Sequence, residues 1–254
     1  MRRGARPAHR AARAVALASA ALLLTGCAQS VDPIERLGKK AAEGVRRSAP
    51  APERAYRHWG LTAPLAAPPR HAARPLSVRT GTRVVDRVTT ADRVVFLTYD
   101  EAAVRDPRLA DLVRELRLPV TVFAGADALG SGRAARLRAA GVTLGGRLPH
   151  GLSRSRQRDE LCAARTRLTR AHAEVHDAAT LRAAADCGIT ALVHWRAETT
   201  RHGLTYAHTP EHLTPGDIIR VTPDRKGALA ERTGRVLREA QERGLTAGKL
   251  GDYL

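Results

Sequence analysis

The sequence predicts an α/β fold built on a mostly parallel sheet or barrel. Residues 94–98 (VVFLT) form a short, unbroken apolar run, which is typical of a strand buried on both faces. From residue 93 to the end of the chain, strand patterns alternate with helical patterns, as in strand–helix–strand units. The length of 254 residues allows one large domain or two small ones with a buried core. In such folds the chemistry lies on the loops that follow the carboxyl ends of the strands.

Local signals predict the individual elements. After the first strand, Asp106 and Pro107 supply an N-cap and a first-turn proline for a helix, and Pro119 stops it. Glycines follow three later helices, at positions 141, 188 and 244. Further strands are expected at 120–124, 142–144, 189–195 and 217–221, and further helices at 133–140, 157–170, 178–186 and 229–240.

Residues 1–26 are predicted to be a lipoprotein signal peptide. Five arginines and no acid precede an apolar run over 14–24, which is too short for a stable membrane span. The run leads into Leu-Thr-Gly-Cys at 24–27, which resembles the bacterial lipobox, so Cys27 is expected to be the lipidation site. The alternative is a plain secretory signal in which the cysteine occurs by chance. With the lipid, the chain is expected on the extracytoplasmic face of the cell membrane.

Residues 27–90 are interpreted as a lipidated tether and lead-in rich in Pro, Ala and Arg. Proline stiffens such a stretch, and its apolar content is too low for it to fold alone. Its basic excess suits attachment to an acidic membrane or wall; alternatively, it follows the chain's general preference for Arg and Ala. Residues 91–254 are then the folded domain.

The charge of the chain first suggests a nucleic-acid partner. Lys and Arg number 43 against 25 Asp and Glu, a formal net charge of +18. An exported chain does not meet genomic DNA, however, and the signal alone removes five arginines. Aromatic residues are only 3% of the chain, which argues against a stacking platform for single strands. Anionic lipid head groups, anionic wall polymers and wall glycan are therefore the expected partners, with no nucleic acid.

Two cysteines remain once lipid takes Cys27. Cys162 and Cys187 form an even pair in an exported, oxidising setting, each placed in or beside a predicted helix. We expect a disulfide between them; the alternative is two small buried thiols.

Several stretches in chain order resemble one family. Residues 95–101 (VFLTYDE) resemble the first motif of polysaccharide deacetylases, the NodB homology domain, usually written T-F-D-D-G. Stretches that resemble the family's second strand, its late helix and strand, and its last catalytic strand follow at 116–123, 181–189 with 193–196, and 213–219. The resemblance covers about residues 93–254. It implies a deformed (β/α) barrel of the polysaccharide deacetylase type, and the sequence leaves open whether this barrel closes.

The resemblance implies metal-assisted hydrolysis of N-acetylated sugars, with zinc or another divalent metal as cofactor. On this pattern Asp100 is the catalytic base and Glu101 the first metal ligand, although the family has Asp at the second position. His150 is one residue out of register with the family's histidine ligands and is the candidate for a second metal ligand. A different interpretation of Asp100 and Glu101 is a strand-end acidic pair held by some of the many arginines.

Other positions depart from the family pattern. Arg147 takes the place of the first histidine ligand and Gly151 that of the second, and a guanidinium repels a metal ion. No R-P-P-Y-G-like segment is found, because 170–177 runs almost directly into the next helix, as though a strand and its loop were deleted. Thr222 falls where the family's late histidine would be. The sequence therefore predicts a degenerate deacetylase, which as a pseudoenzyme would need no metal.

Three functions are compatible with these observations. The first is a cell-envelope lipoprotein whose deacetylase-like domain is catalytically impaired and acts in wall glycan binding or carbohydrate metabolism. The second is an active metal-dependent deacetylase of N-acetylated polysaccharide, a hydrolase of C–N bonds with an altered metal site. The third is a structural or partner-binding envelope lipoprotein without a glycan role.

Overall fold

The computed structural model describes residues 52–69, 72, 81–149, 151–171, 177–225 and 227–254. The chain divides into two compact units, Met1–Ala49 and Pro50–Leu254, and the first lies outside the described residues. The signal peptide and Cys27 fall in that first unit, so both remain predictions. Within the described residues, no helix has the length and apolar character that crossing a membrane requires.

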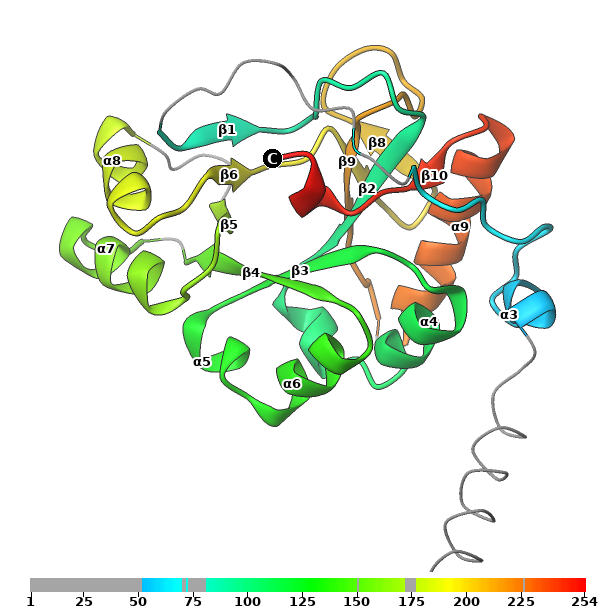
Figure 1. The fold of residues 1–254 in the computed structure, drawn as a ribbon, viewed down its shortest axis with the longest axis horizontal. Coiled ribbons are helices and arrows are strands. Elements are labelled where there is room, and N and C mark those ends of the chain that lie inside the picture. The colour runs from blue at the N-terminus through cyan, green and yellow to red at the C-terminus, as the bar shows by residue number, and fades with distance from the viewer. Residues whose placement is uncertain (1–51, 70–71, 73–80, 150, 172–176, 226) are drawn as a thin grey trace, which may run out of the picture. The chain divides into compact units, whose positions relative to one another are not determined.

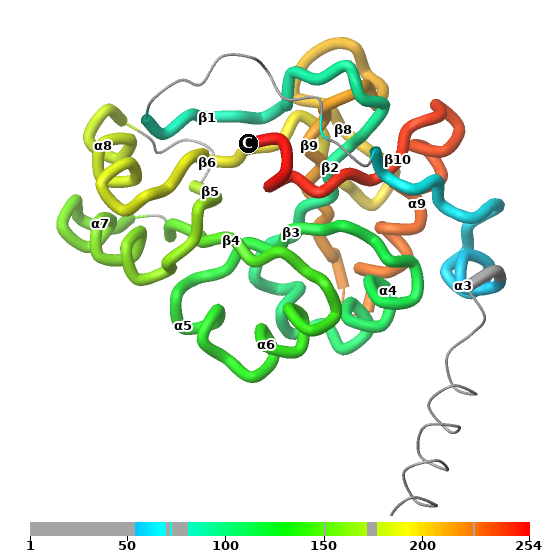
Figure 2. The backbone as a smooth tube through the Cα atoms, viewed as in Figure 1, coloured from blue at the N-terminus to red at the C-terminus, as the bar shows by residue number. Residues whose placement is uncertain are grey.

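The described part of the second unit is built on one curled sheet of ten strands (Figures 1 and 2). Its order is β1-β6-β5-β4-β3-β2-β9-β7-β8, with β10 pairing with β2, and every pair is parallel except the β7–β8 hairpin. The strands are β1 Arg83–Val85, β2 Val94–Tyr99, β3 Val120–Ala124, β4 Thr143–Leu148, β5 Leu168–Ala171, β6 Ala191–Val193, β7 Ala197–Thr199, β8 Leu204–Tyr206, β9 Ile218–Val221 and β10 Thr246–Ala247. Among the described strands, β1 and β8 are the two open ends, so the sheet is an incomplete barrel.

Helices alternate with these strands, as the pattern of the sequence predicts. They are α3 Pro52–His58, α4 Leu109–Leu116, α5 Ala126–Leu129, α6 Gly132–Ala139, α7 Arg154–Ala163, α8 Ala178–Asp186 and α9 Ala228–Glu242, with short 3-10 turns η1 Glu101–Arg105 and η2 Leu250–Asp252. The prediction that the first strand is buried on both faces is confirmed, because all six residues of β2 are buried. Its Leu97 packs in the core beneath the helices, whereas Phe96 packs in the inner core of the half-barrel.

The segment between α7 and α8 differs from the sequence prediction. A helix over 157–170 is wrong: α7 ends at Ala163, and Arg165 has a positive φ of 48°. The chain then forms β5, whose four residues are all buried. The supposed deletion of a strand near 170–177 is therefore wrong for the part that the structure describes, since β5 ends at Ala171. Only one of its residues, Leu168, is a large aliphatic, so the apolar-run criterion misses this strand.

The folded unit also extends upstream of Ala91. Trp59 and Leu61 are buried in the core beneath the helices, and Val88 is buried in the inner core. β1 pairs with β6 in parallel. A few large apolar residues thus anchor described parts of the Pro-rich lead-in to the domain, which its average composition does not reveal.

A disulfide joins Cys162 in α7 to Cys187 at the carboxyl end of α8, with their Cα atoms 4.8 Å apart. It closes a loop with a sequence separation of 25 residues. We expect its reduction to lower the free energy of unfolding by about 3 kcal/mol, because the open chain gains entropy when unfolded. Thermal unfolding with and without dithiothreitol measures the effect. The Cys162→Ala/Cys187→Ala variant, which keeps Cys27, must be insensitive to the reductant; an equal response in both proteins would contradict the assignment.

Candidate functional site

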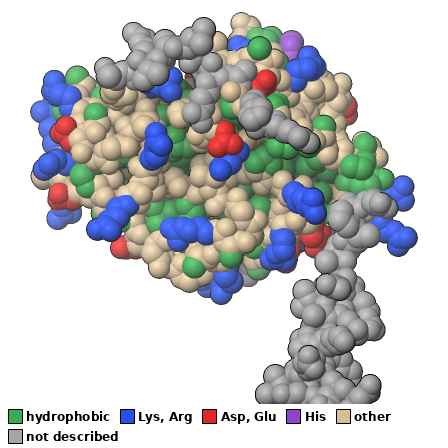
Figure 3. All heavy atoms as spheres, in the orientation of Figure 1, with side chains coloured by type: hydrophobic (Ala, Val, Ile, Leu, Met, Phe, Trp, Pro, Cys, Tyr) green, Lys and Arg blue, Asp and Glu red, His purple; other side chains and the backbone are tan. Residues whose placement is uncertain are grey.

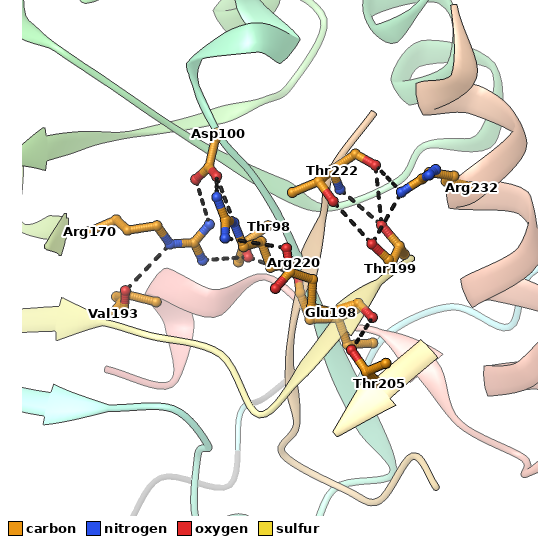
Figure 4. A network of polar contacts seen from close by, with 11 residues as sticks. Thr98, Asp100, Arg170, Val193, Glu198, Thr199, Thr205, Arg220, Thr222 and Arg232 are labelled. Atoms are coloured by element: carbon orange, nitrogen blue, oxygen red, sulfur yellow. Dashed lines mark hydrogen bonds and ion pairs between the residues drawn. The ribbon is translucent and has the colours of Figure 1, made fainter. Parts of the chain in front are cut away.

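Four charged side chains meet toward the carboxyl ends of parallel strands: β2, β9 and β7 are neighbours in the sheet, and β5 is separated from β2 by β4 and β3. Asp100 follows β2, Arg170 lies in β5, Glu198 in β7 and Arg220 in β9. In the register of the sheet, Arg220 is the partner of both Thr98 and Glu198. Figure 4 shows the two guanidinium groups converging on the Asp100 carboxylate. We call these four residues the charge cluster; they lie where ligand sites occur in parallel α/β folds.

Both carboxylate oxygens of Asp100 are occupied by arginine. Arg170 donates from Nη1 to Oδ1 at 3.0 Å, and Arg220 donates from Nε to Oδ2 at 2.7 Å. Burial raises the pKa of Asp100, but the charges and hydrogen bonds of Arg170 and Arg220 outweigh it and lower the pKa below its ordinary value. Asp100 is therefore held as a carboxylate that is a weak proton acceptor.

Arg170 is the buried member of the charge cluster, with a side chain only 3% exposed. Its Nη2 donates to Thr98 Oγ1 at 2.6 Å and its Nε to the carbonyl oxygen of Val193 at 3.4 Å. Its guanidinium carbon lies 4.5 Å from the ring centre of Phe123 and 5.2 Å from that of Trp195. Burial lowers its pKa to about 10, so the group remains charged at neutral pH. These contacts hold the cation in place below the carboxylate.

Arg220 joins Asp100 to the second acid. Its Nη1 lies 3.2 Å from Glu198 Oε1, and its guanidinium carbon lies 4.3 Å from the ring centre of Trp195. The charge cluster thus contains two cations and two anions. Because its formal charges balance, the cluster is a network in which each acid already has a partner.

Glu101 does not join this network. It lies in the first turn of η1, where its Oε2 accepts a hydrogen bond from the backbone N–H of Gly125 at 3.1 Å. Its Oε1 lies 3.8 Å from Nη1 of Arg105, which is largely exposed. Asp100 and Glu101, which the family resemblance implies are the catalytic base and a metal ligand, therefore contact different residues.

The remaining positions are those at or near which the deacetylase family has histidines and this sequence departs from the family pattern. Arg147 lies in β4 as the in-register partner of Arg170. His150, the predicted second ligand, lies outside the described residues. Thr222 donates from Oγ1 to the carbonyl oxygen of Thr199 at 3.0 Å, so its hydroxyl is bound to strand β7. It supplies no imidazole to this site.

The described residues do not fit the divalent metal that the family resemblance implies. Within the ranges that the structure describes, no three His, Cys, Asp or Glu side chains are placed to hold one ion. A catalytic zinc needs about three such ligands and an open position. At this site Asp100 is already bound by two guanidinium groups. Arg147 adds a third cation on β4, the strand next to that of Arg170. Donors of this charge repel a metal ion.

Sequence reasoning missed Arg170, Glu198, Arg220 and Trp195 as site residues. For Arg170 no usable signal was present, because its strand was predicted as part of a helix and its burial appears only in the structure. Arg220, by contrast, interrupts the apolar strand β9. The alternative that arginines hold the strand-end acids agrees with the geometry of Asp100.

Known proteins resemble this chain in sequence and, separately, in structure. No family model matches the sequence. The uncharacterized protein SCO4760 of Streptomyces coelicolor is 48% identical over 191 residues, which cover 67% of this chain and 77% of that protein. A family 4 carbohydrate esterase from Bacillus anthracis has a TM-score of 0.54 at 15% identity, covering 74% of this chain and 98% of its own. The family 4 pseudoenzyme BA3943 of the same organism has a TM-score of 0.53 at 16% identity, covering 65% and 66%.

At these identities the structural likeness establishes the fold. The curled sheet has the barrel-like (β/α) architecture of the family 4 carbohydrate esterases, as the deacetylase resemblance predicts. The fold occurs with and without activity among these neighbours, since one is described as an esterase and another as a pseudoenzyme. The fold alone therefore does not determine the chemistry of this chain, which depends on its own side chains.

Proposed function

The chain belongs to the same family as the uncharacterized protein SCO4760 of Streptomyces coelicolor, and we propose that it keeps the carbohydrate-esterase fold to bind glycan without hydrolysing it. The single observation that carries this proposal is the occupation of both Asp100 carboxylate oxygens by arginine. Without a free oxygen and with a lowered pKa, Asp100 is poorly suited to take a proton from water.

The lack of a three-ligand group among the described residues supports the same proposal. The polysaccharide deacetylases that the sequence resembles use a divalent metal to polarise the acetyl carbonyl and activate water. The described residues here hold guanidinium groups in that region, and Glu101 is bound to a backbone N–H and Arg105. The pseudoenzyme BA3943 of Bacillus anthracis has a similar fold, and it is a precedent for a non-catalytic protein with this architecture.

The proposed place of action is the cell envelope. The signal peptide, the lipid on Cys27 and a position on the extracytoplasmic face of the cell membrane are parts of this proposal. Lys and Arg side chains are spread over the visible face of the molecule and do not gather in one stripe (Figure 3). Such a distribution suits general attraction to an anionic envelope more than the concentrated footprint typical of nucleic-acid binding.

The test uses the full-length protein purified in detergent. We expect no stoichiometric zinc by elemental analysis, no acetate release from chitohexaose, and retention of the protein on insoluble N-acetylated glycan. The exposed-site variant Asp111→Asn should behave identically in all three assays, because its ion pair with Arg114 lies in α4, away from the charge cluster. Stoichiometric zinc with acetate release that is lost in Asp100→Asn would establish an active deacetylase instead. Failure to bind glycan would favour the partner-binding role.

A further inference from the structure

Among the described residues, the carboxyl edge of the half-barrel, which we call the mouth, carries one arginine beyond the charge cluster. Arg170 and Arg220 are balanced by Asp100 and Glu198. Arg147 lies in β4, the strand next to that of Arg170, as the in-register partner of Arg170 in the parallel β4–β5 pair. Since register partners in a parallel pair extend from the same face of a sheet, Arg147 lies on the face that carries Arg170.

Arg147 differs from Arg170 and Arg220 in having no anionic partner among the described residues. Its side chain is half-buried, and it forms no hydrogen bond or ion pair with any residue in the described ranges. Glu101, the other acid that follows β2, contacts Gly125 and Arg105. A partly buried guanidinium without a bound anion carries a desolvation cost that a bound anion would offset.

This arrangement reverses the charge preference of the site. A mouth suited to a divalent cation would present several carboxylates, whereas this one presents a guanidinium in excess. The planar fork of a guanidinium matches a carboxylate through two parallel hydrogen bonds. We propose that the barrel mouth binds an acidic sugar, a glycan unit bearing one carboxylate, and that Arg147 determines its specificity over neutral N-acetylated sugars.

This inference rests on the proposed glycan binding and names the class of glycan. A monoanion is the expected partner, because Arg147 is the one arginine of this group without an anionic partner among the described residues. Arg170 and Arg220 are held by their own contacts, so they position the mouth and leave Arg147 to meet the ligand. A neutral sugar would still contact the same mouth, but it would leave the Arg147 charge without a counterpart.

The experiment compares two soluble probes on the full-length protein. Hyaluronan hexasaccharide alternates a carboxylate sugar with N-acetylglucosamine, and chitohexaose contains N-acetylglucosamine alone. We expect hyaluronan to bind about ten- to hundredfold more tightly by titration calorimetry, the gain typical of a charged hydrogen-bonded pair. Arg147→Gln should bring the hyaluronan affinity down to about that of chitohexaose, and Arg147→Lys should restore only part of the preference because lysine lacks the fork.

The matched control is Arg136→Gln, which removes the same charge from an exposed position of α6. It should change neither affinity by more than about twofold. Equal affinity for both probes, or equal effects of Arg147→Gln and Arg136→Gln, would overturn the acidic-sugar assignment while glycan binding stands. Inorganic phosphate binding more tightly than hyaluronan in an Arg147-dependent way would also overturn it. If neither glycan binds, the proposed function fails as well.

Discussion

Replacing Asp217 by asparagine is expected to lower the free energy of unfolding by about 3–5 kcal/mol. Asp217 is fully buried and its partner Arg196 is 1% exposed, so the pair has no access to water. Arg196 donates from Nε to Oδ1 at 2.6 Å and from Nη2 to Oδ2, and Thr214 donates its backbone N–H to Oδ2 at 2.7 Å. Removing the negative charge leaves a buried guanidinium without its counter-ion.

The loss should extend to the loop after β8, which Arg196 also supports. Its guanidinium donates to the carbonyl oxygens of His208 at 3.0 Å and Pro210 at 2.8 Å. Asp111→Asn is the control, because it removes an exposed pair and should cost less than about 1 kcal/mol. Denaturant unfolding at neutral pH measures both. Similar losses in the two variants would contradict the role assigned to the buried pair, and a smaller loss in Arg196→Met/Asp217→Asn than in Asp217→Asn would support it.

The sequence predicted the fold where hydrophobic pattern alone determines the element. The apolar run of β2 and the spacing of α4 and α9 are local signals, and the structure contains all three elements. β5 was missed because its burial depends on the strands on either side of it, which no local pattern records. The hairpin of β7 and β8 was missed for a similar reason, since each strand has only three residues.

The sequence predicted the position of Asp100 in the site, but it did not predict the arginines that bind Asp100. Asp100 follows a recognisable strand, so its position at the sheet edge could be inferred. Its partner Arg170 is 70 residues away in sequence and Arg220 is 120 residues away, and pairing at that distance depends on strand order and register. A composition rich in arginine hides such pairs further, because most arginines in the described residues are solvent-exposed. The departures at Arg147 and Thr222, by contrast, were readable directly from the sequence.

Asp100→Asn is expected to lower the free energy of unfolding by about 2–4 kcal/mol at neutral pH, somewhat less than Asp217→Asn because Asp100 retains some water contact. The change removes the negative charge that Arg170 and Arg220 share, and it replaces one of the two acceptor oxygens by an NH2 group that cannot accept their hydrogen bonds. It also leaves two like charges facing each other across the lost carboxylate. Glu101→Gln is the control, with an expected loss of about 1 kcal/mol or less, since Glu101 is about one-third exposed and its ion pair is long.

The difference in the free energy of unfolding between the wild-type protein and Asp100→Asn should depend on pH. This dependence shows whether the variant acts through the lost charge of Asp100 or through altered packing. The folded-state pKa of Asp100 is lowered, so its ionised form stabilises the native state fully above the unfolded-state pKa of about 3.9. That stabilisation is lost as the pH falls through the folded-state value, because the carboxylate then takes up a proton. The gap between the wild-type protein and Asp100→Asn should therefore narrow progressively below about pH 4 in denaturant titrations. A gap that stays constant from pH 7 to the acid limit would show that the variant acts through packing and that the two arginines do not depend on the negative charge.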